Sequence, residues 1–82
     1  MALKILQWNC LSVNNNRADL LRLIDLYKFD IIVLSETWLL PGSHFHIRGF
    51  SIFRDDREDG YGGAAILVHN YLTFSPIHIN IN

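Results

Sequence analysis

The sequence predicts an α/β fold. Half of the 82 residues are hydrophobic, an amphipathic helical pattern lies between two short apolar runs, and a second pair of apolar runs flanks a charged, glycine-rich segment. A strand, a helix and a second strand in that order are typical of a crossover between parallel strands. A chain of this length holds one domain at most, and it buries only about 60% of the surface that it exposes when unfolded.

The first predicted strand is the apolar stretch from Leu3 to Trp8, which stops at a polar cluster. The pattern that follows predicts a helix between Asn16 and Lys28. Its apolar residues recur at positions i, i+3, i+4 and i+7 and form one stripe, made of Leu20, Leu23, Ile24 and Tyr27. We expect the side chain of Asn16 to cap this helix, with Asp19 in the reciprocal position three residues later.

The second predicted strand runs from Ile31 to Leu34, a continuous apolar run that is typical of a strand covered on both faces. The segment from Leu39 to Arg48 contains a Pro-Gly turn and is expected to be a loop. Two short apolar runs, Phe50 to Phe53 and Ala64 to Val68, predict a hairpin with a long connection. Alternation between Tyr71 and Asn82 predicts a further edge strand.

Composition limits the classes of function. The formal net charge is −1, so a contact with nucleic acid has to be local and cannot come from a wholly basic surface. One cysteine, Cys10, excludes an intramolecular disulfide and suits a reducing compartment. The start shows no secretion signal, and no apolar run approaches the roughly 20 residues of a membrane span. We therefore expect an intracellular protein, nuclear or cytoplasmic, with no membrane partner.

Two candidate metal ligands, Asn9 and Glu36, lie where predicted strands give way to polar residues. In open α/β sheets, sites form outside the carboxyl ends of strands because side chains there leave the packed core. If the two strands are neighbours, an amide oxygen and a carboxylate can approach one Mg²⁺ ion, which prefers oxygen ligands and keeps several waters. Taken singly, Asn9 could instead close a turn and Glu36 could be a solvated carboxylate.

The order of motifs is more specific than any one of them. Trp-Asn (residues 8–9), an amphipathic helix, Asp-Ile-Ile-Val-Leu-Ser-Glu-Thr-Trp (30–38), Phe-Arg-Asp-Asp-Arg (53–57) and Gly-Gly-Ala-Ala-Ile-Leu-Val (62–68) follow one another. This order resembles the opening of the endonuclease/exonuclease/phosphatase superfamily. The Ser-Glu-Thr-Trp segment is similar to non-long-terminal-repeat retrotransposon endonucleases, relatives of the apurinic-site repair endonucleases. The resemblance implies a four-layer α/β sandwich, with residues 1–82 as the N-terminal part of one domain, truncated before its C-terminal half.

The resemblance also implies a site. Asn9 and Glu36 match catalytic residues that hold the family's metal, Mg²⁺ or Mn²⁺. An arginine-containing loop and a glycine pair near the nucleic acid are matched by Arg54, Arg57, Gly62 and Gly63. The Gly-Asp-x-Asn and Ser-Asp-His segments that the family needs next do not occur in the sequence, so we expect the isolated chain to be inactive. Arg54 and Arg57 could alternatively be neutralised by acidic neighbours on a surface loop.

The expected function is therefore that of the N-terminal portion of a metal-dependent DNA endonuclease, which nicks target sites for a retrotransposon. DNA would be the partner of the complete domain, and a reverse transcriptase would follow in the full polypeptide. Two alternatives stay open: a superfamily phosphoesterase of small-molecule or lipid phosphates, and a non-catalytic remnant or interaction module. Trp8 and Trp38 are expected to pack rather than to stack on bases, because large aromatic side chains dominate core burial.

Overall fold

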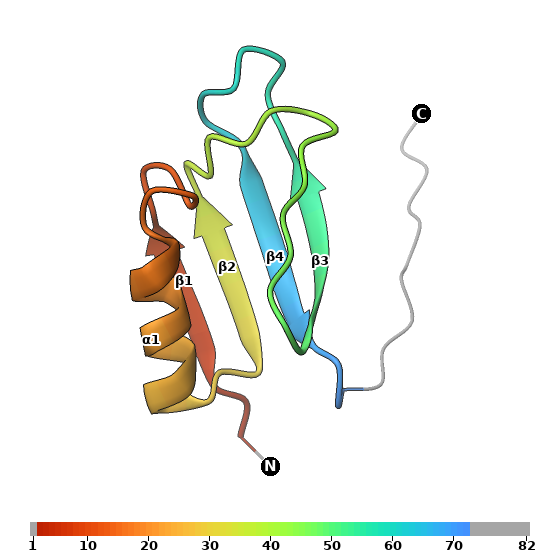
Figure 1. The fold of residues 1–82 in the computed structure, drawn as a ribbon. Coiled ribbons are helices and arrows are strands. Elements are labelled where there is room, and N and C mark those ends of the chain that lie inside the picture. Colours follow the sequence, from red (N-terminus) through yellow and green to blue (C-terminus); the bar gives the residue numbers. More distant parts are fainter. Residues whose placement is uncertain (1, 73–82) are drawn as a thin grey trace.

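The computed structural model describes residues 2–72, which form a four-stranded mixed sheet and one α-helix (Figure 1). In chain order the elements are β1 (Ile5–Asn9), α1 (Arg17–Tyr27), β2 (Ile31–Ser35), β3 (Phe50–Asp55) and β4 (Ala64–His69). The strand order across the sheet is β1-β2-β4-β3, with β1 parallel to β2 and the other neighbours antiparallel. The α/β class and the strand-helix-strand opening are confirmed.

The strand bounds differ from the predicted ones because pairing, and not apolar character, sets where a strand begins and ends. β1 starts at Ile5 rather than Leu3, since Ile5 is the first residue with a partner on β2, and it continues to Asn9 opposite Ser35. β3 extends two residues beyond Phe53 because Asp55 pairs with Ala64. Residues 70–72 form a turn and a bend after β4. Residues 73–82 of the predicted edge strand lie outside the described part of the chain.

The helix is confirmed, but its predicted side-chain cap is wrong. Asn16 is the N-cap residue and makes no side-chain cap hydrogen bond. Its amide group turns back instead and donates to carbonyl oxygens of the preceding loop, with the shortest distance, 2.7 Å, to Cys10. The carbonyls of that tight loop therefore compete successfully with the helix N-terminus for the Asn16 side chain. At the other end Lys28 adopts the left-handed conformation and donates its N–H to the Ile24 carbonyl, as C-cap residues often do.

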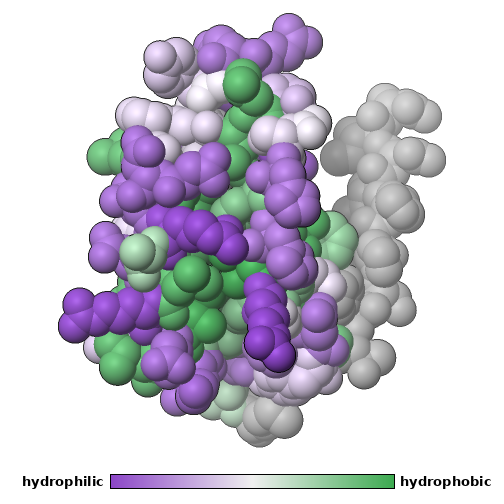
Figure 2. Space-filling model, viewed as in Figure 1, coloured by the Kyte–Doolittle hydropathy of each residue, from purple (hydrophilic) through white to green (hydrophobic). Residues whose placement is uncertain are grey.

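The hydrophobic core lies on one face of the sheet. Ile32 and Leu34 point into it from β2 and pair with Leu67 and Ala65 of β4, which are also buried. Figure 1 shows what covers this face: α1 lies in front of β1 at one edge of the sheet, and the chain between β2 and β3 runs in front of β3 and β4. Buried side chains line both covers, namely Leu20 of the helix and Leu39, Phe45 and Ile47 of the crossing segment. The outer surface is mostly hydrophilic, with an apolar area between helix and crossing segment (Figure 2).

The opposite face of the sheet is only partly covered by the described residues. Ile31 and Val33, which point there, are half-buried, and Ile5 and Ile66 remain 57% and 46% exposed. Within residues 2–72 the second strand is therefore buried on one face and partly covered on the other, and cover of both faces stays a prediction for a larger domain. A sheet with one open apolar face needs a further packed layer, as the four-layer sandwich implied by the resemblance would supply.

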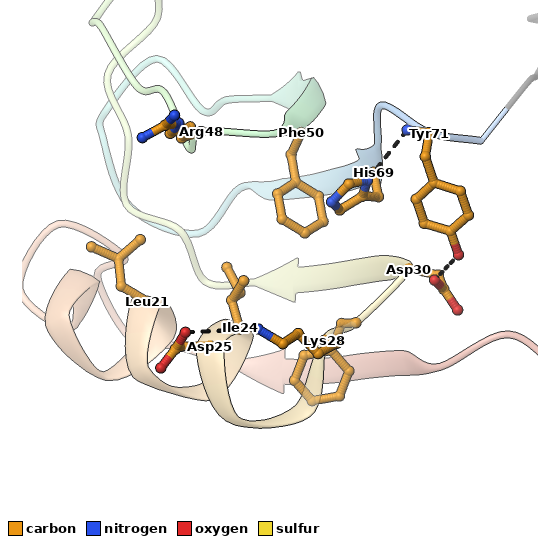
Figure 3. Close-up of a pocket in the computed structure, with 10 residues that line it drawn as sticks. Leu21, Ile24, Asp25, Lys28, Asp30, Arg48, Phe50, His69 and Tyr71 are labelled. Atoms are coloured by element: carbon orange, nitrogen blue, oxygen red, sulfur yellow. Dashed lines mark hydrogen bonds and ion pairs between the residues drawn. The ribbon is translucent and has the colours of Figure 1, made fainter.

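Asp30 joins three strands at the end of the sheet where β2 begins. Its backbone N–H donates to the Lys4 carbonyl, and its own carbonyl accepts from His69. The carboxylate accepts hydrogen bonds from the Tyr71 hydroxyl (Figure 3) and from the Lys4 backbone N–H. Because both bonds favour the charged form, with that of Tyr71 contributing most, the pKa of Asp30 lies below its ordinary value.

The substitution Asp30→Asn should make the stability of the fold depend less on pH under acidic conditions. The folded pKa of Asp30 is depressed, so its stabilising contribution is complete above the unfolded pKa, about 3.9, and is lost as the pH falls through the folded value. We expect the urea midpoint of the wild type to fall more steeply than that of Asp30→Asn below about pH 4. Asp25→Asn, an exposed helix carboxylate, is the matched control and should keep the wild-type slope. Equal slopes for wild type and Asp30→Asn would contradict this assignment.

Candidate metal and nucleic-acid site

Asn9 and Glu36 lie at the same edge of the sheet. Asn9 is the last residue of β1 and pairs with Ser35, the last residue of β2, and the two strands are parallel. Glu36 follows directly, and the pairing continues one step further through the N–H of Cys10, which donates to the Ser35 carbonyl at 3.0 Å. Their shared position at the carboxyl ends of neighbouring strands, expected from the sequence, is therefore confirmed. Their role as metal ligands stays a prediction.

The loop between β1 and α1 holds the backbone of Glu36 from one side. The N–H of Ser12 donates to the Glu36 carbonyl at 2.9 Å, and the N–H of Val13 donates to the Thr37 carbonyl at 3.0 Å. Cys10, Ser12 and Val13 are all buried. Two extra backbone hydrogen bonds thus continue the alignment of β1 and β2 beyond the end of the sheet.

The long connection between β3 and β4 holds the same segment from the other side. Trp38 donates its backbone N–H to the Gly62 carbonyl at 2.9 Å, and Thr37 donates to the Gly63 carbonyl at 3.4 Å. The backbone of residues 36–38 is therefore bonded to both flanking loops. We call this arrangement the Glu36 clamp, defined by residues 12–13, 36–38 and 62–63.

The clamp keeps the candidate ligand in an unusual conformation. Glu36 and Trp38 have φ values of 55° and 53°, which are uncommon for residues other than glycine. Each such residue costs on the order of 1–3 kcal/mol and persists only where the surroundings enforce it. Between them Thr37 is fully buried, and its hydroxyl oxygen has no hydrogen-bond partner among the described residues.

Gly63 is required where it stands because of Thr37. Its φ is +82°, and a Cβ atom at this position would lie 2.9 Å from the Thr37 hydroxyl oxygen and 3.2 Å from the Asp55 carbonyl oxygen. At Gly62 a Cβ would come 3.0 Å from Cδ of Arg57. Both glycines thus have a structural task in the clamp, which the sequence did not indicate. Their proposed closeness to nucleic acid is a separate prediction that these contacts leave untested.

The two arginines of the predicted nucleic-acid loop have different surroundings. The guanidinium of Arg54 bonds to the Asp56 carboxylate, with Nη2 2.7 Å from an oxygen, and donates to the backbone carbonyls of Ser43 and Leu40. Arg54 therefore has the neutralising acidic neighbour that was the alternative to phosphate contact, and it fixes the loop after β2. Arg57 lines a pocket of about 340 Å³ together with Glu36, Trp38, Asp59, Tyr61 and Gly62.

Cys10 is a residue of the site that sequence reasoning did not single out. Its thiol lies 3.3 Å from the Ser35 carbonyl and 3.5 Å from the Glu36 carbonyl. Burial raises the pKa of the Cys10 thiol, a backbone hydrogen bond offsets part of that rise, and the negative charge of Glu36 adds to it. Cys10 is thus a neutral packing residue beneath the Glu36 backbone.

The donor set fits part of a magnesium site. Glu36 offers a carboxylate and Asn9 an amide oxygen, and Mg²⁺ in proteins is often held by one or two carboxylates together with waters and substrate phosphates. Within residues 2–72, no group of three His, Cys, Asp or Glu side chains is placed to hold a metal ion.

A larger pocket of about 390 Å³ lies at the other end of the sheet, around Asp30, His69 and Tyr71 (Figure 3), far from both candidate ligands in the strand register.

Comparison with known proteins shows the family to which the chain belongs. The model of the endonuclease/exonuclease/phosphatase family matches residues 6–82, so the chain belongs to that family. A search of curated protein sequences gave no match. No helix within residues 2–72 is long and apolar enough to cross a membrane.

Three solved structures are similar to the chain. The first is a 3′ phosphatase from Neisseria, NExo, bound to a product DNA hairpin, with 27% identity and a TM-score of 0.74 over 82% of this chain and 27% of that one. The second is the 3′-5′ exonuclease NExo of Neisseria meningitidis, with 27% identity and a TM-score of 0.67 over 80% of this chain and 27% of that one. The third is the catalytic domain of Xenopus laevis APE2, with 26% identity and a TM-score of 0.66 over 82% of this chain and 23% of that one. The chain thus spans about a quarter of the length of these structures.

The substitution Gly63→Ala tests the clamp. An alanine at this positive φ is strained wherever it stands, and this conformational cost lowers the free energy of unfolding. At Gly63 we expect a further loss of about 1–3 kcal/mol, because the added methyl group overlaps Thr37 and the Asp55 carbonyl. Gly42→Ala is the matched control: Gly42 has φ +79° but open space around its Cβ position, so it should lose only about 1–2 kcal/mol. Urea unfolding of the wild type, Gly63→Ala and Gly42→Ala measures the conformational cost and the added cost of the overlap. Equal losses for the two variants would show that no close approach exists at Gly63.

Proposed function

We propose that the chain is the N-terminal part of a magnesium-dependent DNA endonuclease that belongs to a retrotransposon. Membership of the endonuclease/exonuclease/phosphatase family supports the reaction class, and similarity to a structure that contains product DNA supports the substrate class. The Ser-Glu-Thr-Trp segment at residues 35–38, which resembles retrotransposon endonucleases, supports the narrower origin. The observation that argues most strongly for a metal-dependent nuclease is the placement of Glu36 and Asn9 at one sheet edge.

The chain's own residues would hold the metal ion and orient the phosphate. Glu36 and Asn9 are the residues that would ligate Mg²⁺ or Mn²⁺; the clamp would fix the Glu36 backbone, and the Trp38 indole N–H donates to the Glu36 carboxylate. A bound metal of this kind stabilises negative charge on phosphate oxygens. Arg57, in the same pocket as Glu36, would add a guanidinium that can pair with a phosphate. The family's remaining catalytic segments, which would supply a general base and further ligands, do not occur in this sequence.

A second candidate is processing of DNA 3′ ends. The two Neisseria structures, described as a 3′ phosphatase and a 3′-5′ exonuclease, support it at 27% identity. Both candidates use the same ligands and differ in whether an internal phosphodiester or a terminal phosphate lies beside them. With the remainder of the domain supplied, nicking of supercoiled plasmid that depends on Glu36 would support the endonuclease. Release of a 3′ phosphate without nicking would support end processing.

Metal binding by the isolated chain tests the site directly. We expect Mn²⁺ to broaden the amide NMR signals of residues next to Asn9 and Glu36, because a paramagnetic ion relaxes nearby nuclei. Glu36→Gln should abolish this selective broadening, since an amide is a much weaker ligand than a carboxylate. The same chain with Mg²⁺ should leave supercoiled plasmid intact, because two ligands cannot also position a base and a phosphate.

The control variant is Asp25→Asn, which removes an exposed carboxylate of α1 and should leave the broadening pattern unchanged. Broadening that persists in Glu36→Gln would refute the assignment of the ligand. Glu36-dependent nicking by the isolated chain would show that it is more complete than proposed.

A further inference from the structure

Trp38 and Tyr61 form an exposed aromatic pair beside Glu36. Their ring centroids are 5.7 Å apart at an interplanar angle of 73°, an edge-to-face arrangement. Trp38 is 38% exposed and Tyr61 is 65% exposed. The sequence favoured packing for both tryptophans, and Trp8 does lie half-buried against the core, but Trp38 does not. Large aromatic side chains at the surface next to a polar site are characteristic of binding surfaces.

The position of Trp38 is fixed by the clamp. Its neighbours Thr37 and Leu39 are buried, and its backbone N–H is bonded to the Gly62 carbonyl. Its indole N–H also donates to a carboxylate oxygen of Glu36 at 3.3 Å. The exposed ring is therefore hydrogen-bonded to the candidate metal ligand itself and rests against Tyr61. A ring held in this way loses little conformational entropy when a ligand packs on it.

The surroundings of the pair indicate the chemistry of its ligand. Trp38 and Tyr61 line the pocket of about 340 Å³ that also contains Glu36 and Arg57. One pocket thus combines flat apolar rings, a guanidinium and two carboxylates, that of Asp59 and that of Glu36, which is proposed to hold Mg²⁺. Single-stranded nucleic acid matches this combination, because its phosphates pair with cations while its bases stack on aromatic side chains.

We infer that Trp38 and Tyr61 form a stacking platform for an unpaired nucleobase adjoining the phosphate that the site would hold. The inference rests on the proposed function for the position of the phosphate, and it adds a specificity to that function. A duplex keeps its bases stacked on one another, so a platform of this kind favours single-stranded, flipped or frayed DNA. The ligand class is therefore unpaired DNA, selected by its base and not by its backbone alone.

Binding of oligonucleotides to the chain tests the inference. Fluorescence anisotropy would compare labelled dodecathymidylate with a base-free deoxyribose-phosphate oligomer of the same length, in Mg²⁺ and at constant salt. Base stacking on aromatic side chains predicts a preference of about tenfold or more for the oligomer that carries bases. Trp38→Ala should abolish the preference, Trp38→Phe should keep most of it, and Tyr61→Ala should reduce it. Tyr27→Ala, an exposed aromatic on α1, should bind as the wild type does.

A second readout does not depend on the stability of the alanine variants. In a Trp8→Phe background Trp38 is the remaining tryptophan, and stacking should quench its fluorescence with dodecathymidylate but not with the base-free oligomer. Equal affinity for the two oligomers, no detectable binding of either, or a preference that survives in Trp38→Ala would each overturn the platform. Absence of a base preference in the wild-type chain, while Mn²⁺ still binds through Glu36, rejects the platform alone. A base preference without Mn²⁺ binding rejects the proposed function and keeps the platform.

Discussion

The structure of the candidate site depends on backbone hydrogen bonds that hold residues 36–38 between two loops. β2 ends at Ser35, and from there the chain has left the sheet and would be free to turn away from Asn9. Ser12 and Val13 on one side, and Gly62 and Gly63 on the other, keep it in place. The left-handed conformations at Glu36 and Trp38 are the local cost of this placement. They direct one carboxylate and one indole ring to the same surface pocket.

This constraint also explains how distant segments contribute to one site. The loop after β1 bonds to residues 36 and 37, and the connection before β4 bonds to residues 37 and 38, because the sheet order β1-β2-β4 puts β2 between their strands. The covered face of the sheet supplies the stability that this strained segment needs, through Ile32, Leu34 and their partners on β4. The other face leaves apolar side chains such as Ile5 and Ile66 exposed, as expected of part of a larger layered domain.

The sequence predicted the elements and the shared edge of Asn9 and Glu36, because hydrophobic periodicity and strand-end polarity are local patterns. It did not predict the role of Asn16, whose side chain bonds to the loop before the helix and not to the helix itself. The sequence offered neutralisation of Arg54 by an acidic neighbour as an alternative, and Asp56 is that neighbour. It did not predict that Arg54 also donates to the carbonyls of residues 40 and 43, or that Gly63 is needed for close approach to Thr37. These features depend on how the loops pack in the folded chain, which composition and spacing do not encode. The exposed Trp38 is of the same kind, since its surface position results from the clamp.

Amide hydrogen exchange tests the Glu36 clamp most directly, because it reports the hydrogen bonds of the clamp's backbone amides in the native chain. We expect the amides of Ser12, Val13 and Trp38 to exchange about as slowly as those of the central strands β2 and β4, although all three lie outside any strand or helix. Exchange of these amides as fast as that of the exposed turn at Gly42 would contradict it. In that case nothing in the fold would hold Glu36 beside Asn9.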